Sequence, residues 1–460
     1  MKQDLMEEAS EEELSKILHS FQKGKIPGPD GFTIDLFLGF YELLKADNLK
    51  VVRESKRTGN VVGAMNSTFI TLIPKKQKGE TFDDFRPISC CNMIYKVIAK
   101  TIAQRLKPIL NQFITEEQFG FLFNRQIHDA VSLAQEAMHS IQKDKQATFA
   151  LKVDLSKAYD RVNCTFLQFL LIKIGMPLEM AEWIVGCIKS TSFAVLINDS
   201  PSNFFLPTRG LRHGYPLSPF LFLLVAESLS GSIHNAMEER RIKGVRIDNQ
   251  IELTHVLFVD DVLMFGEGTL GNLVEVLDNY QSATGMEINL EKSKLSHNKV
   301  QEELLTQAKE IIPISTTPLL EGFKYAGFQL KPNAYSCKDW EWLYKKIEKR
   351  VSMWTNIFLS RERHLVLLKA VLQSILVYWA LISYMPKGIL SRIRKKWLSF
   401  LWTPRKKVEG IPLVKWTTIV LLKYKGGWGI KNPELFSKAL AAKSLWHMIE
   451  NPESLWERTM

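Results

Sequence analysis

The chain has 460 residues, and 46% of them are hydrophobic, which is enough for a sizeable core and excludes wholesale disorder. Lys and Arg total 60 against 49 Asp and Glu, and the resulting charge of +11 favours a polyanionic partner, either nucleic acid or an acidic membrane. The five cysteines include no CxxC pair, so neither a disulfide framework nor a four-cysteine zinc site is expected, and a reducing compartment fits.

Helices and strands alternate in the first half of the chain. Ser10 and Glu13 have the spacing of a capping box and predict the start of a helix, which the Gly- and Pro-rich sequence after Phe21 ends. Strands are predicted at 66–74 and 148–155, where β-branched or alternating apolar residues occur. Helical spacing of apolar residues predicts three helices, at 88–112, 129–143 and 165–189.

The second half continues the irregular alternation. It contains predicted paired strands at 193–197 and 204–206, a long apolar helix at 219–239, two apolar runs within 252–265 and an amphipathic helix at 270–284. This order favours a mixed α+β core over a regular doubly wound sheet. The uncharged stretch 370–386 is at the lower length limit of a membrane span, and we interpret it as a buried core helix.

The two ends of the chain differ in charge. The first residues are acidic and have no apolar run after their charges, so neither a secretory signal nor a transit peptide is predicted. The stretch Lys387–Lys431 is basic and rich in tryptophan, and either it holds nucleic acid or its tryptophans are core and its lysines solvated. The short basic runs RIRKK and PRKK are typical of nuclear import, so an intracellular, nuclear location is expected.

Three acidic residues end or interrupt predicted strands. HVLFVDDVLMF predicts a β-hairpin with Asp260 and Asp261 at or near its turn, and their side chains point in different directions unless the turn re-aims them. Asp154 ends the strand in LKVDLSKAYDRV, where an unpaired acid is costly to bury. Three carboxylates on two strands could hold two Mg²⁺ ions about 3.5–4 Å apart. A lone Asp-Asp pair is more often simple turn chemistry, so the surrounding sequence decides.

A Gly- and Pro-rich segment, FFLPTRGLRHGYPLSPFLFLLVAESL, lies between these acids. Its glycines, Gly210 and Gly214, allow backbone to approach a base or sugar closely. Arg209, Arg212 and His213 supply positive or hydrogen-bond donor groups. The alternative is an ordinary loop at the N-terminus of a helix.

In this order, the three segments resemble reverse transcriptases of the non-LTR (LINE-type) retrotransposons, particularly those of plants. Flanking blocks agree with the resemblance: IPGPDGF, NSTFITLIPKK, DFRPIS, TGMEINLEKSK, FKYAGF, LVLLKAVLQSILVYW and GGWGIKN. The resemblance implies an α+β right-hand polymerase fold (fingers, palm, thumb) followed by a helical basic tail. It implies a polymerase portion without the family's endonuclease. The expected regions are an N-terminal helical extension at 1–65, the fingers and palm at 66–300, the primer-grip region and helical thumb at 301–385, and a basic Trp-rich C-terminal region at 386–460.

The resemblance also implies roles for single residues. Asp154, Asp260 and Asp261 are the expected catalytic acids and metal ligands, with the Leu155 carbonyl as a further ligand. The expected nucleotide contacts are Lys75, Arg86, Tyr159, Gly214 and Lys292, with Tyr159 the aromatic gate that rejects a 2′-OH. The expected template and primer contacts are Arg209, His213, Tyr325 and Gly327. The alternatives are a core aromatic for Tyr159 and solvated charges for the lysines and Arg86.

The chain departs from the family's usual residues at four positions of these blocks. The family usually has Gln, Cys, Ala and Leu where this chain has His213, Tyr215, Val259 and Ala326. None of these departures removes a catalytic acid. The implied activity is RNA-directed DNA synthesis from dNTPs on an RNA template and DNA primer, with two Mg²⁺ (or Mn²⁺) ions and no membrane. The alternatives are a non-catalytic nucleic-acid-binding remnant and a maturase-like RNA-binding protein.

Overall fold

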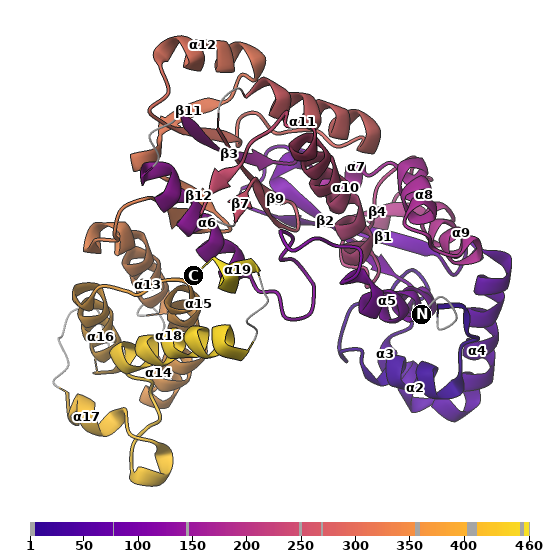
Figure 1. Cartoon of the computed structure of the whole chain (residues 1–460). Helices are drawn as coiled ribbons and strands as arrows, with labels where there is room; N and C mark the ends of the chain where they lie inside the picture. The colour runs from indigo at the N-terminus through magenta and orange to yellow at the C-terminus, as the bar shows by residue number, and fades with distance from the viewer. Residues whose placement is uncertain are drawn as a thin grey trace.

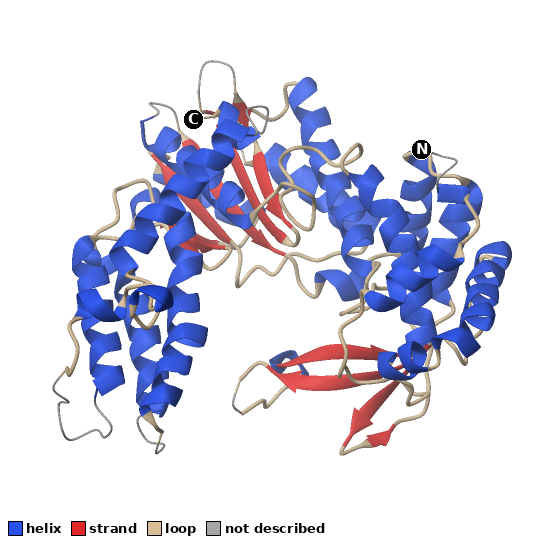
Figure 2. Ribbon diagram, turned by 90° about the horizontal axis from the view of Figure 1, so that it is seen from below, coloured by secondary structure: helices blue, strands red, loops and turns tan. Residues whose placement is uncertain are grey.

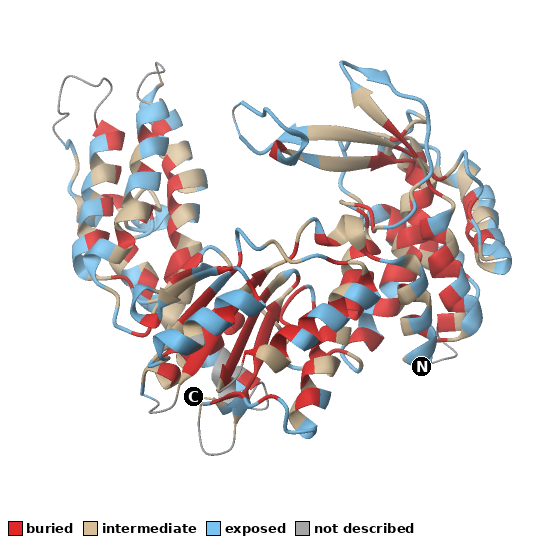
Figure 3. Ribbon diagram, turned by 90° about the horizontal axis from the view of Figure 1, so that it is seen from above, coloured by how far each residue is buried: buried red, intermediate tan, exposed pale blue. Residues whose placement is uncertain are grey.

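The computed structural model describes residues 5–76, 78–143, 147–247, 251–267, 270–354, 359–402, 412–450 and 455–459. A central sheet forms the base of the molecule, and two arms extend from it on the same side (Figures 2 and 3). One arm is a bundle of helices from the last third of the chain, and the other carries a second, smaller sheet from the first half (Figures 1 and 2).

The central sheet has five strands in the order β11-β10-β3-β9-β8. Their bounds are β3 Thr148–Asp154, β8 His255–Phe258, β9 Asp261–Glu267, β10 Lys294–Asn298 and β11 Ser315–Pro318. The strand β3 lies between β9 and β10 and is antiparallel to both, while β11 runs parallel to β10. Because β11 belongs to this sheet, the unit predicted to end at residue 300 continues to Pro318.

Alternating side chains give the central sheet two buried faces. Leu151 and Val153 of β3 pack in one core cluster with α10 (Ser218–Glu238) and α11 (Gly271–Thr284). Ala150 packs in a second cluster with α6 (Ile127–Lys143) and the helical arm. This is the period-2 burial that the sequence predicted for β3. The remaining short elements nearby are α7 Ala158–Arg161, α12 Glu302–Ile311, β6 Val245–Arg246 and β7 Glu252–Leu253.

The outer sheet has four strands in the order β2-β1-β4-β5. Their bounds are β1 Ser67–Pro74, β2 Phe85–Cys91, β4 Ser192–Ile197 and β5 Ser200–Pro201. The prediction of a helix at 88–112 is wrong for its first residues. Residues 88–91 pair with β1 as part of β2, and the helix, α5, is Met93–Leu110. The predicted pairing of 193–197 with 204–206 occurs as one bridge between Phe193 and Phe205.

The helices behind the outer sheet follow the predicted pattern with one break. The single helix predicted at 165–189 is two helices, α8 (Cys164–Lys173) and α9 (Leu178–Lys189). Gly175 between them has φ 81°, and Pro177 precedes α9, so the chain turns where glycine and proline favour it.

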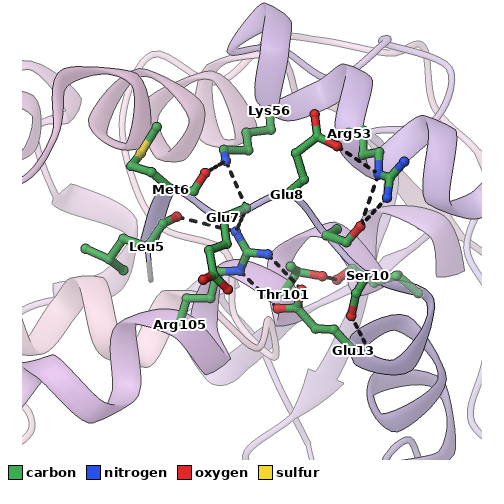
Figure 4. A network of polar contacts seen from close by, with 12 residues as sticks. Leu5, Met6, Glu7, Glu8, Ser10, Glu13, Arg53, Lys56, Thr101 and Arg105 are labelled. Carbon is green, nitrogen blue, oxygen red and sulfur yellow. Dashed lines mark hydrogen bonds and ion pairs between the residues drawn. The ribbon is translucent and has the colours of Figure 1, made fainter. Parts of the chain in front are cut away.

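The N-terminal helices are α2 Glu11–His19, α3 Ile34–Gly39 and α4 Tyr41–Thr58. The side chain of Ser10 accepts a hydrogen bond from the Glu13 N–H at 3.1 Å, but the Glu13 carboxylate binds Arg105 of α5 at 2.7 Å, so only half of the capping box forms (Figure 4). Arg53 of α4 donates to the Ala9 carbonyl. These contacts and the burial of α2 in the first cluster join residues 5–65 to the rest of that core.

The helical arm follows a short hairpin, β12 (Phe323–Tyr325) and β13 (Phe328–Leu330). Its helices are α13 Glu341–Trp354, α14 Arg361–Leu367, a π-helical turn Leu368–Leu372, α15 Gln373–Ile382, α16 Lys387–Trp402, α17 Trp416–Ile419, α18 Pro433–Glu450 and α19 Leu455–Arg458. By length and composition alone, two segments, Ser218–Glu238 and Arg361–Ile382, are apolar enough to cross a membrane. Core helices pass the same test. In the second segment Leu372, Leu376 and Trp379 are buried, but only 33% of its apolar window is, so the predicted core helix is covered on one side only.

The basic tail uses most of its described aromatic residues for packing. Trp397, Phe400 and Trp402 are all buried in the second core cluster, so for these three residues the structure favours the core alternative over base stacking. Arg392 and Lys396 of the RIRKK run form ion pairs with acids of α13, at 2.6 Å and 2.8 Å. The PRKK run lies outside the described residues.

Candidate active site

The three predicted acids meet at one end of the central sheet. Asp154 lies directly opposite Asp261 in the antiparallel pairing of β3 with β9, so their side chains leave the same face of the sheet. Phe258 pairs with Asp261, which leaves Val259 and Asp260 as the two residues of the hairpin turn. The prediction of a hairpin with both acids at or near its turn is confirmed.

A segment from elsewhere in the chain holds this turn. Gln118 Oε1 accepts hydrogen bonds from the backbone N–H groups of Val259, at 3.0 Å, and Gly120, at 2.9 Å. Leu257 exchanges backbone hydrogen bonds with Glu117 and Phe119, so the segment runs along β8. Val259 has φ 60°, a strained conformation for a β-branched residue, which the packed neighbours maintain.

The end of β3 is fixed by the segment that contains Lys292. The Asp154 N–H donates to Ser293 Oγ at 3.0 Å, and the Asp154 carbonyl accepts from the Asn289 N–H at 2.7 Å. Leu155 lies opposite Ile288 in a bridge made by the Asp154 carbonyl and the Ser156 N–H, so this bridge does not use the Leu155 carbonyl. Lys292 Nζ lies 3.9 Å from Asp154 Oδ2, which places a cation beside the acids.

The two acids of the hairpin are harder to ionise than ordinary carboxyl groups. Desolvation raises the pKa of Asp260, although that residue is exposed at the turn, and the charge of Asp154 raises it further. Desolvation also raises the pKa of Asp261, with Lys152 opposing the shift. A divalent cation would relieve both costs, so the carboxylates fit a group of hard-cation ligands.

Tyr159 lies beside Asp260 and rests on a second aromatic ring. Its ring stacks on Phe222 of α10, with centroids 4.6 Å apart and planes 11° apart, and lies 5.2 Å from His213. Burial, and secondly the charge of Asp260, raise the pKa of the Tyr159 hydroxyl. The ring is half-buried, so it combines a packed back with an accessible edge.

The Gly-rich loop is bonded to the backbone around Tyr159. The N–H groups of Gly210 and Leu211 donate to the carbonyls of Val162 and Tyr159, at 2.8 Å and 2.6 Å. Gly210 has φ 99°, and a Cβ there would lie 2.6 Å from the Asp160 carbonyl oxygen, so glycine is required. The exposed Arg209 lines a pocket of about 160 Å³ that Asp160 and His213 also line.

The other residues of this loop divide into accessible and buried positions. His213 Nε2 lies 3.3 Å from Asp160 Oδ1, and Gly214 has φ 85° with open space where a Cβ would be. Arg212 is buried and donates to the Tyr215 hydroxyl at 2.8 Å and the Cys187 carbonyl at 3.0 Å. The prediction that Arg212 offers donors to a ligand is therefore wrong in this structure, because those donors hold the outer sheet's core.

The predicted cations of the outer sheet lie on its exposed edge. Lys75 follows β1 and donates to the Asp83 carbonyl at 2.8 Å, and Arg86 of β2 is exposed opposite Ile73. Asp83 also forms an ion pair, at 2.8 Å, with Lys157, which follows Asp154 by three residues in the sequence. This ion pair joins the outer sheet to the strand end that carries the first acid, while Lys75 and Arg86 remain on the arm.

The hairpin β12–β13 presents its turn rather than its tyrosine. Tyr325 is fully buried and its hydroxyl has no hydrogen-bond partner among the described residues, so it does not offer its side chain to a primer here. Burial, and secondly the charge of Asp261, raise its pKa, which places it near that acid. Ala326 and Gly327 form the turn, with φ 47° and 81°, and Gly327 is exposed.

Comparison with known proteins identifies the family. The model of the family described as reverse transcriptase (RNA-dependent DNA polymerase) matches residues 73–330. This span contains all three acids, the Gly-rich loop and the hairpin β12–β13. The chain belongs to the reverse transcriptase family. Its central sheet is therefore the palm, its outer sheet lies in the fingers, and the helical arm is the thumb side of an α+β right-hand fold.

Two curated relatives come from retrotransposons of the non-LTR type. The "Transposon TX1 uncharacterized 149 kDa protein" of Xenopus laevis is 26% identical over 400 residues, which is 85% of this chain and 30% of the relative. The "Retrovirus-related Pol polyprotein from type-2 retrotransposable element R2DM" of Drosophila melanogaster is 24% identical over 446 residues, 91% of this chain and 40% of the relative. The chain thus spans well under half the length of these relatives. The non-LTR resemblance is confirmed, and the narrower plant type stays a prediction.

One solved structure, that of apo telomerase from Candida tropicalis truncated from its C-terminal domain, is similar at 13% identity and a TM-score of 0.40. The match covers 65% of this chain and 60% of that chain. Reverse transcriptases use divalent metal ions and bind a nucleic acid template and primer.

The sequence did not predict the residues that support these groups. Gln118, Phe222 and Ser293 each contact a predicted site residue or its turn, and Ser293 lies in the TGMEINLEKSK block, although no role was predicted for any of the three. Phe222 lies within the Gly-rich block, so its proximity to Tyr159 had a weak signal. Gln118 had none, because its contact with Val259 spans 141 residues of sequence.

Proposed function

We propose that this chain catalyses RNA-directed DNA synthesis, in which dNTPs are added to the 3′-OH of a DNA primer on an RNA template. The observation that supports this most directly is the register of Asp154 opposite Asp261, with Asp260 in the adjoining turn. Three carboxylates grouped at one end of the sheet repel one another and lose hydration, and bound cations would balance both costs.

The carboxylates of Asp154, Asp260 and Asp261, with the Leu155 carbonyl, are the groups that would hold two Mg²⁺ ions. When bound, such ions lower the pKa of the attacking hydroxyl and neutralise charge on the leaving pyrophosphate. Lys292, beside Asp154, offers a further positive charge to the same leaving group.

Tyr159 is proposed as the residue that selects the sugar of the incoming nucleotide. Phe222 supports one face of its ring, so the ring is held in place and does not swing away to admit a larger sugar. Gly214, with no side chain and open space beside it, leaves room for a base or sugar near His213. Arg209 is exposed in the same loop and is placed to meet a phosphate.

The fingers cations and the basic tail are proposed to hold the template and primer backbone. Lys75 and Arg86 are exposed on the arm that faces the thumb side across the palm (Figure 2). Because Arg392 and Lys396 already form ion pairs with acids of α13, α16 has fewer unpaired positive charges available to bind phosphates. A nuclear location remains a prediction from sequence.

Primer extension on an RNA template tests the proposal. The wild-type chain is expected to extend a DNA primer with dNTPs when Mg²⁺ is present and to stop when the ion is chelated. A variant with Asp154, Asp260 and Asp261 all changed to Asn should bind the primer–template and fail to extend it. Asp278→Asn, an exposed acid on α11, is the matched control and should extend normally. Salt-sensitive binding without extension by the wild-type chain would contradict the proposal and favour a non-catalytic remnant.

A further inference from the structure

A second group of metal-ligand side chains lies at the start of β8, at the end of that strand away from the hairpin turn. Side chains of α10 contact β8 there. Glu117, His234 and His255 place one ligand atom each within 4.8 Å of one another. Within the described ranges this is the one group of three that meets this limit. The carboxylate oxygens of the three polymerase acids therefore do not all lie within 4.8 Å of one another. The family's reaction uses none of these three side chains.

The spacing within the group suits a tetrahedral ion. His234 Nε2 lies 3.3 Å from Glu117 Oε1, which equals the separation of about 3.3 Å between two ligands at Zn²⁺ bond lengths. The rings of His234 and His255 have centroids 5.4 Å apart, so only a small movement of one ring completes a three-ligand site. One carboxylate and two imidazoles are a donor set that zinc uses with a fourth position left for water or another acid.

The groups around His255 favour the form that binds a metal. His255 is fully buried, and its Nδ1 lies 2.9 Å from Thr254 Oγ1. When Nδ1–H donates to that hydroxyl, Nε2 is unprotonated and accepts a hydrogen bond from the Ser230 hydroxyl, which an ion bound to Nε2 would displace.

The carboxylate of Glu117 can supply a negative charge to the group. Glu117 is half-buried, and one of its oxygens lies within 4.8 Å of a ring nitrogen of each histidine. Glu227, two turns before His234 on α10, lies outside this group, and the Thr115 hydroxyl donates to its carboxylate at 3.4 Å.

We propose that Glu117, His234 and His255 form a structural Zn²⁺ site, with water as the fourth ligand. The ion would join three parts of the palm: α10, the start of β8, and the segment 115–120. That segment bonds to Leu257 of β8 and, through Gln118, to the turn that carries Asp260. The site would therefore stabilise the base of the catalytic hairpin without contacting substrate.

The test measures zinc on the full-length chain, with Mg²⁺ in excess to occupy the polymerase acids. Total metal analysis should give about one zinc per chain, and Co²⁺ in its place should give the visible absorption bands of a tetrahedral ion. Zinc should also raise the thermal midpoint of the wild-type chain. A chain with Asp154, Asp260 and Asp261 changed to Asn should keep the zinc.

Variants locate the ion. His234→Gln and Glu117→Gln should each weaken zinc binding by more than about 100-fold in chelator competition, since loss of a mere supporting partner costs about 10–100-fold. His139→Gln is the matched control, because His139 has the same side-chain exposure of 36% and its own glutamate, Glu136, 3.5 Å away. Binding unchanged in His234→Gln, equal losses in His139→Gln, or no zinc bound by the wild-type chain would each overturn the proposal.

Discussion

Replacing Gln118 by leucine should loosen the catalytic hairpin although Gln118 touches none of the three acids. The side chain is buried, and its one oxygen accepts from the N–H groups of Val259 and Gly120. Leucine leaves both donors buried without partners, at about 1–3 kcal/mol each. Gln118 Nε2 is itself buried without a partner, so its removal offsets part of this cost. The expected net loss is about 2–4 kcal/mol in the free energy of unfolding.

Urea denaturation followed by circular dichroism measures this loss. Gln112→Leu is the control, because Gln112 lies six residues earlier and is exposed, so its replacement should change stability by less than about 0.5 kcal/mol. At a temperature where both variants are folded, Gln118→Leu should also slow single-turnover extension by about 10–100-fold, since Asp260 is carried by the loosened turn. Equal stabilities and equal rates for the two variants would refute the assignment of the turn's support to Gln118.

Three further predictions concern selectivity, turn strain and thiol chemistry. Tyr159→Ala should admit ribonucleotides in primer extension, and an unchanged preference for dNTPs would remove its proposed role. Ala326 occupies a left-handed position before Gly327, so Ala326→Asn should raise the free energy of unfolding by up to about 1 kcal/mol, and a lower urea midpoint would contradict this. Burial raises the pKa of Cys187 to about 12, so on the folded chain a thiol reagent at pH 8 should label the exposed Cys337 and leave Cys187 unmodified until denaturant is added; labelling of both at equal rates would contradict its burial.

Local sequence was sufficient to predict the parts of the palm that repeat a simple pattern. Alternating apolar residues predicted β3, and two apolar runs around Asp260 predicted the hairpin β8–β9, because each strand buries both of its faces against helices. The acids stand at strand ends for a reason visible in sequence: a charge within those runs would have to be buried. The order of these segments was then enough to indicate the family.

Long-range pairing accounts for what the sequence could not predict. Residues 88–91, the first part of the helix predicted at 88–112, instead end strand β2, because β1 supplies a partner for their backbone. Tyr325 carries the family pattern but is buried by the helical arm. Trp397 and Trp402 are core residues for the same reason, since only the folded bundle shows which side of α16 is covered. The group of Glu117, His234 and His255 is assembled from three distant segments and has no motif.

The central claim is that Asp154 and the two acids of the hairpin form one metal-dependent polymerase site. Single-turnover primer extension across a Mg²⁺ titration tests it most directly, comparing the wild-type chain, Asp154→Asn and the control Asp278→Asn. Loss of several kcal/mol of charge stabilisation predicts a rate at least about 1,000-fold lower for Asp154→Asn at every Mg²⁺ concentration, with the control unchanged. Extension by Asp154→Asn at the wild-type rate and with the wild-type dependence on Mg²⁺ would contradict the claim.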